Sequence, residues 1–165
     1  MWEQETALAG EAAQEAGKTI LELFGKKTQV VMKGEIDPVS EADLRSERMT
    51  LELISRRFPR DSILTEEAGE RNLDPARLWI VDPLDGTVNF THGFPMFAVS
   101  IALQVDGEIV LGVVLNPLLD ERFEARKGGG AFLNGQAIAV SRIAKLQESL
   151  LATGFPYDVH REHQR

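Results

Sequence analysis

The sequence contains no cysteine among its 165 residues. This absence excludes a disulfide framework and a thiolate metal site, and it leaves no argument for secretion. The N-terminus lacks the basic start and apolar stretch of a signal peptide, and no apolar run reaches the length needed to span a bilayer. We therefore expect a protein of the reducing cytoplasm that has no membrane partner.

Basic residues are also scarce, because 18 Lys and Arg stand against 26 Asp and Glu and the net charge is -8. This balance argues against a nucleic-acid partner, since phosphate backbones are bound by clustered Lys and Arg. An anionic substrate would need a local source of positive charge, and a bound metal ion can supply it. Hydrophobic residues make up 43% of the chain, which is enough for the core of an ordinary globular protein.

Helical spacing of apolar residues appears twice in the N-terminal part of the chain. The first predicted helix runs from about Ala9 to Phe24, with Gly25 as its stop. A short β-rich segment follows at residues 28–33. The second predicted helix begins at Ser40 and ends before Pro59. Its expected buried face consists of four residues: Leu44, Leu51, Ile54 and Phe58.

Short apolar runs then replace the helical pattern and indicate strands. Asp106-Gly107 and Asn134-Gly135 are typical hairpin turns between such runs. These turns predict an α+β fold in which an antiparallel sheet meander packs against two helices. The expected strands lie at residues 62–65, 78–81, 96–105, 108–116, 121–127, 129–133 and 136–140.

The end of the chain carries a further apolar run, "SLLATGF", at residues 149–155. This run is typical of a buried strand, yet no partner strand follows it, and an unpaired strand is unfavourable. We expect it either to dock on the meander or to belong to a longer protein. The predicted organisation is a metal-binding α+β domain at residues 1–148 and, at 149–165, the start of a truncated second α/β region.

Carboxylates follow two of the predicted strands. Asp82 directly follows the apolar run 78–81, Asp85 lies one turn further on, and Glu66 follows the other short apolar run. If these two strands are neighbours in one sheet, the carboxylates converge. Like charges at close range repel unless a cation lies among them. Because all the candidate ligands are hard oxygen atoms, Mg²⁺ is favoured over zinc.

The residues after Asp85 are expected to supply a binding site for phosphate. The segment "GTVNF" can open a helix with Asp85 near its N-cap, and free N–H groups at a helix start bind phosphate oxygens. Glycine at position 86 permits close approach of an anion. A phosphate monoester can therefore bridge the metal ions and the N–H groups of Gly86 and Thr87. This arrangement suits phosphoryl hydrolysis, which needs mainly positioning and charge neutralisation.

Four segments together resemble a known family. "DPLDGTVNF", "THGFP", "ILTEE" and "DPVSEAD" are similar to motifs of the inositol monophosphatase family of Mg²⁺-dependent phosphatases. The resemblance runs from the first helix through "GGGAFLNGQAI" to the end of the chain. It implies the first half of the layered sugar-phosphatase fold, in a homodimer. It also implies hydrolysis of a small phosphate monoester, myo-inositol monophosphate above all, to alcohol and inorganic phosphate.

The resemblance implies a set of metal ligands. These are the carboxylates of Glu66, Asp82 and Asp85 and the main-chain carbonyl of Leu84, with Asp82 bridging two ions.

The resemblance also implies which residues act on the substrate. Thr87 and Asp43 orient the attacking water, and Glu66 is the third catalytic residue. Lys33 matches a lysine near the site. The substrate itself is expected against the turn formed by Leu84, Asp85, Gly86 and Thr87.

The chain departs from the family pattern at its C-terminal end. Family members continue into a second α/β region that supplies another metal-binding aspartate and most contacts to the organic part of the substrate, and the corresponding Trp-Asp motif is missing here. Related activities that share this core are fructose bisphosphatase, 3'-phosphoadenosine phosphatase and histidinol phosphatase. A regulatory module that binds metal without turnover is the alternative from a different class.

Simpler structural roles compete with the catalytic ones. Asp-Pro and Asp-Gly pairs are ordinary turn formers, and Glu66-Glu67 alone fits a solvated loop. Ser40 and Asp43 have the spacing of a capping box, so Asp43 can serve the helix, the chemistry or both. A structural hydrogen bond is the favoured role of His92, and Asn89 is expected to hold its turn. The "GGG" at residues 128–130 lacks the Lys-Ser/Thr helix of a phosphate loop and is expected to be a bulge or tight bend.

Overall fold

The computed structural model describes residues 1–26, 30–32 and 38–153. Lys33 and residues 154–155 of the predicted last strand lie outside these described residues. The helices are α1 (Glu3–Leu23), α2 (Glu41–Arg57) and α3 (Thr87–Thr91), with a 3-10 turn at Leu146–Glu148. A small sheet pairs β1 (Val30–Met32) with β2 (Pro38–Ser40). The main sheet consists of β3 (Ser62–Thr65), β4 (Gly69–Arg71), β5 (Arg77–Asp85), β6 (Ala98–Val105), β7 (Glu108–Asn116), β8 (Glu121–Arg126), β9 (Gly130–Leu133) and β10 (Gln136–Ile138).

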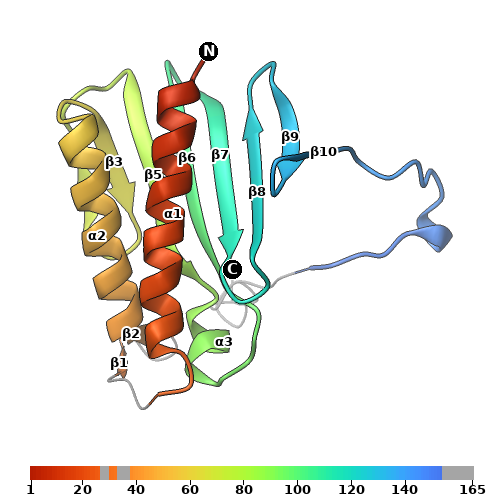
Figure 1. Cartoon of the computed structure of the whole chain (residues 1–165), viewed down its shortest axis with the longest axis horizontal. Helices are drawn as coiled ribbons and strands as arrows, with labels where there is room; N and C mark the ends of the chain where they lie inside the picture. Colours follow the sequence, from red (N-terminus) through yellow and green to blue (C-terminus); the bar gives the residue numbers. More distant parts are fainter. Residues whose placement is uncertain (27–29, 33–37, 154–165) are drawn as a thin grey trace, which may run out of the picture.

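The main sheet confirms the predicted meander and adds one parallel pair. Its eight strands lie in the order β10-β9-β8-β7-β6-β5-β3-β4, and every neighbouring pair from β5 to β10 is antiparallel (Figure 1). Asp106-Gly107 and Asn134-Gly135 form turns of this meander with positive φ, as predicted. In contrast, β3 runs parallel to β5, with Ile63 beside Trp79. The sheet is therefore mixed.

The segment between β3 and β5 contains a strand that was not among the expected ones. Residues 69–71 form β4, which pairs antiparallel with β3 on the outer edge of the sheet. The chain then returns to the start of β5 on the other side of β3. This return makes β3 and β5 parallel, because β4 has already reversed the chain once.

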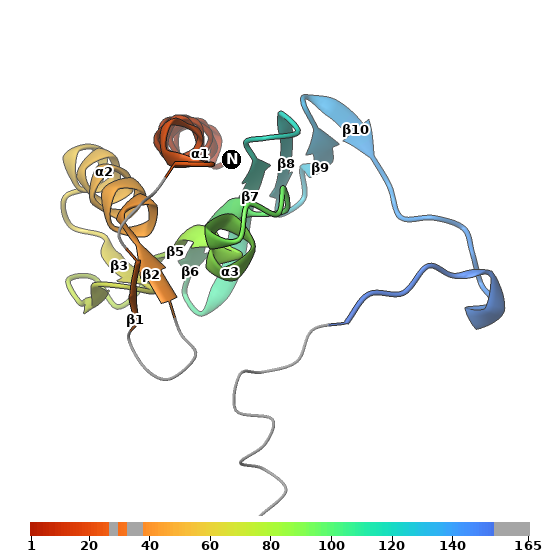
Figure 2. The same cartoon turned by 90° about the horizontal axis from the view of Figure 1, so that it is seen from below.

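Helix α1 packs on the sheet through small side chains. Ala9, Ala12, Ala13 and Ala16 have no exposed surface, and neither has Ile20. Alanines let a helix approach a sheet closely, and this stripe lies on the same side of the sheet as α2 (Figure 2). None of the helices in the described part of the chain is long and apolar enough to cross a bilayer.

Helix α2 begins after Ser40, as predicted, but its buried face was predicted incorrectly in part. Ile54 is buried, whereas Leu44 is 47% exposed. The buried positions in the first turns are instead mostly polar: Ala42, Asp43, Ser46, Glu47 and Thr50. Hydrophobic spacing alone could not reveal this face, because most of its residues are polar. Their hydroxyl groups can be buried because they donate hydrogen bonds to carbonyl oxygens of the same helix, as Ser46 Oγ does to Ala42 O at 2.6 Å.

Among the residues that the structure describes, the main sheet has one face covered by helices and one open face. Val113 on β7 faces the helices and is fully buried, whereas its neighbour Val114 points the other way and is 41% exposed. Along the strand register, the side chains that share the face of Val114 include Leu64, Ile80, Asp82, Ser100, Ala102 and Phe123. We call this the open face, and most of it is apolar.

The predicted strand at residues 149–155 is wrong as far as residue 153. Residues 139–153 run away from the sheet and contain only the 3-10 turn (Figure 1). Leu150 and Leu151 are 99% and 68% exposed. An apolar run becomes a strand only when a neighbouring strand accepts its hydrogen bonds, and composition does not report that neighbour. The division at residue 148 stays a prediction.

Candidate metal and phosphate site

The parallel pairing of β3 and β5 brings the predicted carboxylates to one edge of the sheet. Glu66 directly follows β3, and Asp82 lies in β5 just before a register shift that carries the strand on to Asp85. Because parallel strands end at the same edge, the residues after both strands become neighbours. Glu66 and Asp82 line one hollow of about 380 Å³, together with neighbouring residues of β3, β5 and β6.

Asp82 has an unusual electrostatic environment. Its pKa is raised to about 7, with burial as the largest cause and the negative charges of Glu66 and Asp85 next. Asp43 adds to the rise, while the hydrogen bond from the Leu84 N–H to Asp82 Oδ1, at 3.2 Å, opposes it. Three other carboxylates therefore act on Asp82 at this edge. A divalent cation would offset their mutual repulsion and return Asp82 to its charged form.

Asp43 and Thr87 are joined directly. The Thr87 hydroxyl lies 2.8 Å from Asp43 Oδ1 and 3.1 Å from the carbonyl oxygen of Leu84. The other oxygen of Asp43 accepts hydrogen bonds from the N–H and the hydroxyl of Ser40, at 2.8 and 2.5 Å. Asp43 thus forms the predicted capping box and also holds Thr87, so both of its expected contacts exist in one buried carboxylate.

The turn between β5 and α3 depends on Gly86. This residue is the N-cap of α3 and has a φ of 94°, a backbone angle that residues with a side chain rarely adopt. A Cβ atom here would also lie 3.1 Å from the carbonyl oxygen of Met96. Asp85 was predicted near the N-cap and lies one residue before it. The first turn of α3 leaves N–H groups without intrahelical partners beside the carboxylates.

The neighbouring polar residues have structural contacts, as expected. Asn89 Nδ2 donates to the carbonyl oxygen of Met96 at 2.7 Å and thereby closes the loop after α3. His92 Nδ1 lies 2.8 Å from the carbonyl oxygen of Val88. The glycines at 128–130 form the tight turn between β8 and β9, with positive φ at Gly128 and Gly130.

The carboxylates do not form a complete metal site by themselves in the described part of the chain. Within residues 1–26, 30–32 and 38–153, no three His, Cys, Asp or Glu side chains are arranged so that they could hold a metal ion among themselves. Mg²⁺ does not require such an arrangement, because it keeps several waters and is usually bound by one or two carboxylates together with substrate phosphate. The oxygen donors of Glu66, Asp82 and Asp85 fit this kind of site. Their assignment as metal ligands, with the Leu84 carbonyl, stays a prediction.

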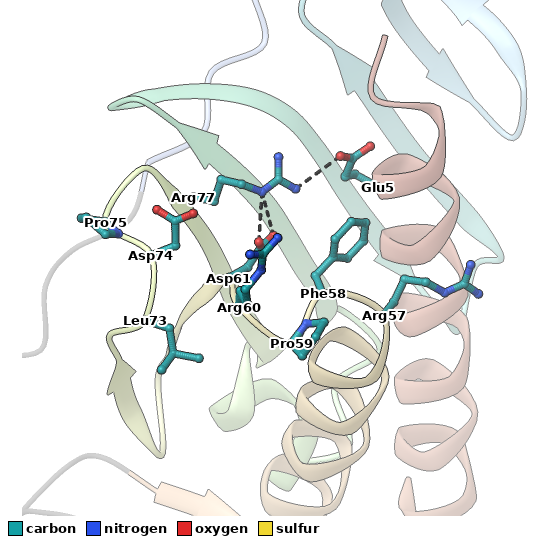
Figure 3. A pocket seen from close by; sticks show the side chains of 10 residues that line it. All are labelled: Glu5, Arg57, Phe58, Pro59, Arg60, Asp61, Leu73, Asp74, Pro75 and Arg77. Carbon is teal, nitrogen blue, oxygen red and sulfur yellow. Dashed lines mark hydrogen bonds and ion pairs between the residues drawn. The ribbon is translucent and has the colours of Figure 1, made fainter.

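A larger hollow, of about 900 Å³, lies at the opposite end of β5 (Figure 3). Its central groups already satisfy one another: Arg77 Nε contacts both oxygens of Asp61 at 3.0 Å, and Arg77 Nη2 contacts Glu5 at 3.3 Å. Burial lowers the pKa of Arg77, but the hydrogen bonds and charges of Asp61 and Glu5 outweigh it and raise the pKa above its usual value. We interpret this network as a structural connection rather than a reactive site.

Sequence reasoning missed one acidic residue near the site. Glu47 is 5% exposed and accepts a hydrogen bond from the N–H of Ala68, in the turn that carries Glu66. Its spacing from Asp43 could have revealed it, because residues four positions apart lie on the same face of a helix.

Comparison with known proteins identifies the class to which this fold and site belong. The family model described as "Inositol monophosphatase family" matches residues 1–165, and the chain belongs to this family. An inositol-1-monophosphatase of Rhizobium meliloti is 45% identical over 150 residues, which are 89% of this chain and 56% of the relative. A histidinol-phosphatase of Chlorobaculum parvum is 45% identical over 139 residues, 84% of this chain and 54% of the relative.

The fold is similar to that of solved family members. The structure of an inositol monophosphatase from Anabaena superposes with a TM-score of 0.82 at 41% identity, covering 96% of this chain and 57% of that one. The chain thus spans about half the length of the curated relatives and solved structures that it matches. The similarity confirms the α+β fold with two helices on one face of a sheet.

Proposed function

We propose that this chain is the metal-binding part of a Mg²⁺-dependent phosphatase that hydrolyses a small phosphate monoester. The observation that carries the proposal is the parallel pairing of β3 and β5, since it brings Glu66 and Asp82 to one hollow. The charge of Asp43, the partner of Thr87, also acts on Asp82. The first candidate substrate is myo-inositol monophosphate, which the names of several relatives support.

The proposed ion site uses the carboxylates of Glu66, Asp82 and Asp85 and the carbonyl of Leu84. When bound there, Mg²⁺ would supply positive charge to neutralise the phosphoryl oxygens and the departing oxygen. The main-chain N–H groups of Gly86 and Thr87 would bind the phosphate and fix its orientation. Together the ion and the N–H groups would bind an anionic substrate even though the chain has a net charge of -8.

The proposed role of Thr87 follows from its contact with Asp43. The Thr87 hydroxyl donates its proton to Asp43 in a hydrogen bond, so its oxygen can accept a hydrogen bond from a water molecule. Glu66 is the second acceptor for this water. The water oxygen forms a bond to phosphorus as the ester P–O bond breaks, and the proton that the water loses is taken up by the departing alkoxide, which becomes the alcohol. The protein groups therefore position the water for its attack.

The test is release of inorganic phosphate from myo-inositol monophosphate with and without Mg²⁺, in the longest natural form of the protein. Asp82→Asn should abolish the Mg²⁺-dependent turnover, because it removes a charge from the centre of the carboxylate cluster. Asp106→Asn, in an exposed hairpin turn, is the matched control and should leave turnover unchanged. Circular dichroism checks that both variants fold. Unchanged turnover in Asp82→Asn would refute the site.

Substrate profiling tests the second candidate. Because a histidinol-phosphatase is among the similar proteins, histidinol phosphate is to be assayed beside the inositol ester. Fructose 1,6-bisphosphate belongs in the same series, since one similar protein of known structure is named an inositol monophosphatase-fructose 1,6 bisphosphatase. Binding of Mg²⁺ without phosphate release from any of these esters would favour the regulatory module instead.

We also propose that the protein is a homodimer and acts in the cytoplasm. The family resemblance supports the dimer, and the lack of cysteine agrees with a reducing compartment. Sedimentation analysis of the natural protein tests the dimer, and a single monomeric species would contradict it.

A further inference from the structure

Glu47 is a buried carboxylate with a specific contact to the turn after β3. It lies in the middle of α2, is 5% exposed, and its Oε1 accepts a hydrogen bond from the N–H of Ala68 at 2.9 Å. The two residues are 21 positions apart in the chain. Burying a carboxylate is unfavourable unless it is hydrogen-bonded, so this contact is more than a chance approach of surface groups.

The turn that Glu47 holds is short and carries Glu66. β3 ends at Thr65 and β4 starts at Gly69, and these two residues pair across the hairpin. Glu66, Glu67 and Ala68 form its tip. The Ala68 N–H also lies 3.2 Å from the buried hydroxyl oxygen of Thr65, so it points inward between two acceptors.

The same helix holds the other side of the site in the same way. Asp43, four residues before Glu47, contacts the Thr87 hydroxyl in the segment after β5. Residues four apart lie one above the other on a helix face. One face of α2 therefore presents two buried carboxylates, and each holds one of the two segments that follow the parallel strands β3 and β5.

We propose that Glu47 is a positioning residue that fixes the main chain next to Glu66 and so keeps the Glu66 carboxylate directed at the ion site. This inference rests on the proposed function, because it concerns a ligand of that site. Glu47 acts through its hydrogen bond to Ala68 rather than through its charge. Groups that hold metal ligands in place normally change metal affinity by about 10–100-fold when they are removed.

Two conservative variants separate the hydrogen bond from the charge. Glu47→Gln keeps the length of the side chain and an oxygen acceptor but loses the charge. Glu47→Asp keeps the charge but is shorter by one carbon–carbon bond, roughly 1.5 Å, which takes the oxygen out of hydrogen-bond range. Glu52→Asp is the control for helix propensity, because Glu52 is an exposed residue of the same helix and pairs only with Arg56 in the described structure.

The experiment measures the Kd for Mg²⁺ by calorimetry and the exchange rate of the Ala68 amide hydrogen by NMR in metal-free protein. Glu47→Asp should weaken Mg²⁺ binding by about 10-fold or more and speed Ala68 exchange. Glu47→Gln and Glu52→Asp should leave both quantities close to those of the unmodified chain.

Each other result overturns the inference in a recognisable way. A Glu47→Asp variant with faster exchange and unchanged Kd would make Glu47 a purely structural residue. If Glu47→Gln loses as much affinity as Glu47→Asp, then the charge is what matters. If the unmodified chain binds no Mg²⁺, the proposed metal site itself fails, and the role of Glu47 fails with it.

Discussion

The Thr87 hydroxyl is held by one of the most fully buried acids of the chain. Asp43 is 1% exposed and receives hydrogen bonds from the N–H and the hydroxyl of Ser40 as well as from Thr87. These contacts leave the carboxylate little freedom to turn. The direction of the Thr87 oxygen is therefore set before any substrate arrives, which is the property that a water-orienting group needs.

Replacement of Thr87 tests this role at the scale of a single hydroxyl. Thr87→Val keeps the shape of the side chain but removes the oxygen, so kcat for phosphate release should fall by about 100-fold or more. Thr87→Ser keeps the hydroxyl and should retain most of the activity. The measurement is steady-state phosphate release by both variants at saturating Mg²⁺. Equal rates for Thr87→Val and Thr87→Ser would show that the hydroxyl takes no part.

Asp82 gives a prediction about pH. Its folded-state pKa of about 7 lies above the ordinary value of 3.8, so the metal-free folded protein binds a proton that the unfolded chain has lost. Stability therefore decreases as pH rises from about 4 to about 7, because the folded state must give up this proton. Asp82→Asn removes the contribution.

Urea unfolding in EDTA, at a pH near 5 and again near 8, measures this effect. The stability of the unmodified chain relative to Asp82→Asn should be lower at the higher pH, and added Mg²⁺ should reduce the deficit. The two proteins also share every other titrating group, so the difference isolates position 82. Parallel pH dependences in EDTA would contradict the assignment of the shift to Asp82.

At the scale of elements, a buried ion pair joins three segments far from the carboxylate site. Asp61, just before β3, accepts hydrogen bonds from Arg77 at the start of β5 and from the indole N–H of the buried Trp79 at 2.9 Å. Arg77 also reaches Glu5 on α1 (Figure 3). The network therefore ties the N-terminal ends of the parallel strands to the first helix.

Asp61→Asn should lower the free energy of unfolding by about 3 kcal/mol, because it leaves a partly buried guanidinium without its main partner. Asp106→Asn is again the control, since Asp106 is exposed and asparagine adopts its positive φ equally well. Urea unfolding of the two variants measures the difference. A loss of stability in Asp61→Asn no greater than in the control would show that the network contributes little.

The elements were largely predictable, and the errors have identifiable physical causes. Strands from β6 to β10 follow one another through short connections, so local patterns were sufficient to order them. The parallel position of β3 depends on β4, a strand of three residues that are all exposed. Such a strand has no hydrophobic pattern. Leu44 was misplaced because the buried face of α2 is largely polar near the site.

The candidate site was predictable to the extent that its residues lie in compact motifs. Asp82, Asp85 and Thr87 fall within a few positions of one another, and Glu66 follows a recognisable strand. Glu47 was missed because its partner is a main-chain N–H of Ala68, and a main-chain group leaves no mark in the sequence. Sequence patterns reveal side chains that do chemistry more readily than side chains that hold loops.

At the scale of the whole molecule, the main sheet is apolar on both faces, while the helices in the described part of the chain cover only one. Val113 and Val114 are consecutive residues that point to opposite faces, and their exposed fractions are 0% and 41%. They therefore form a matched pair for testing the architecture. A charge at position 113 would be buried under α1, whereas a charge at position 114 would meet solvent.

Val113→Lys should prevent folding, whereas Val114→Lys should fold with a cost of about 1 kcal/mol or less. Val114→Lys should also reduce self-association of the chain, because it interrupts the apolar surface of the open face. Circular dichroism and light scattering over a range of protein concentrations measure the two effects. Loss of folding in Val114→Lys would mean that this face is covered in the isolated chain.

The alanine stripe of α1 has a consequence for synthesis of the chain on the ribosome. α1 emerges before β7, and the β7 residues on which it packs are translated roughly a hundred residues later, a delay of about 5–20 s at typical elongation rates. During this interval the exposed apolar face of the helix must not associate with other segments of the nascent chain. Alanine keeps helical propensity high while exposing little apolar area per residue, so the stripe suits a helix that has to wait for its partners.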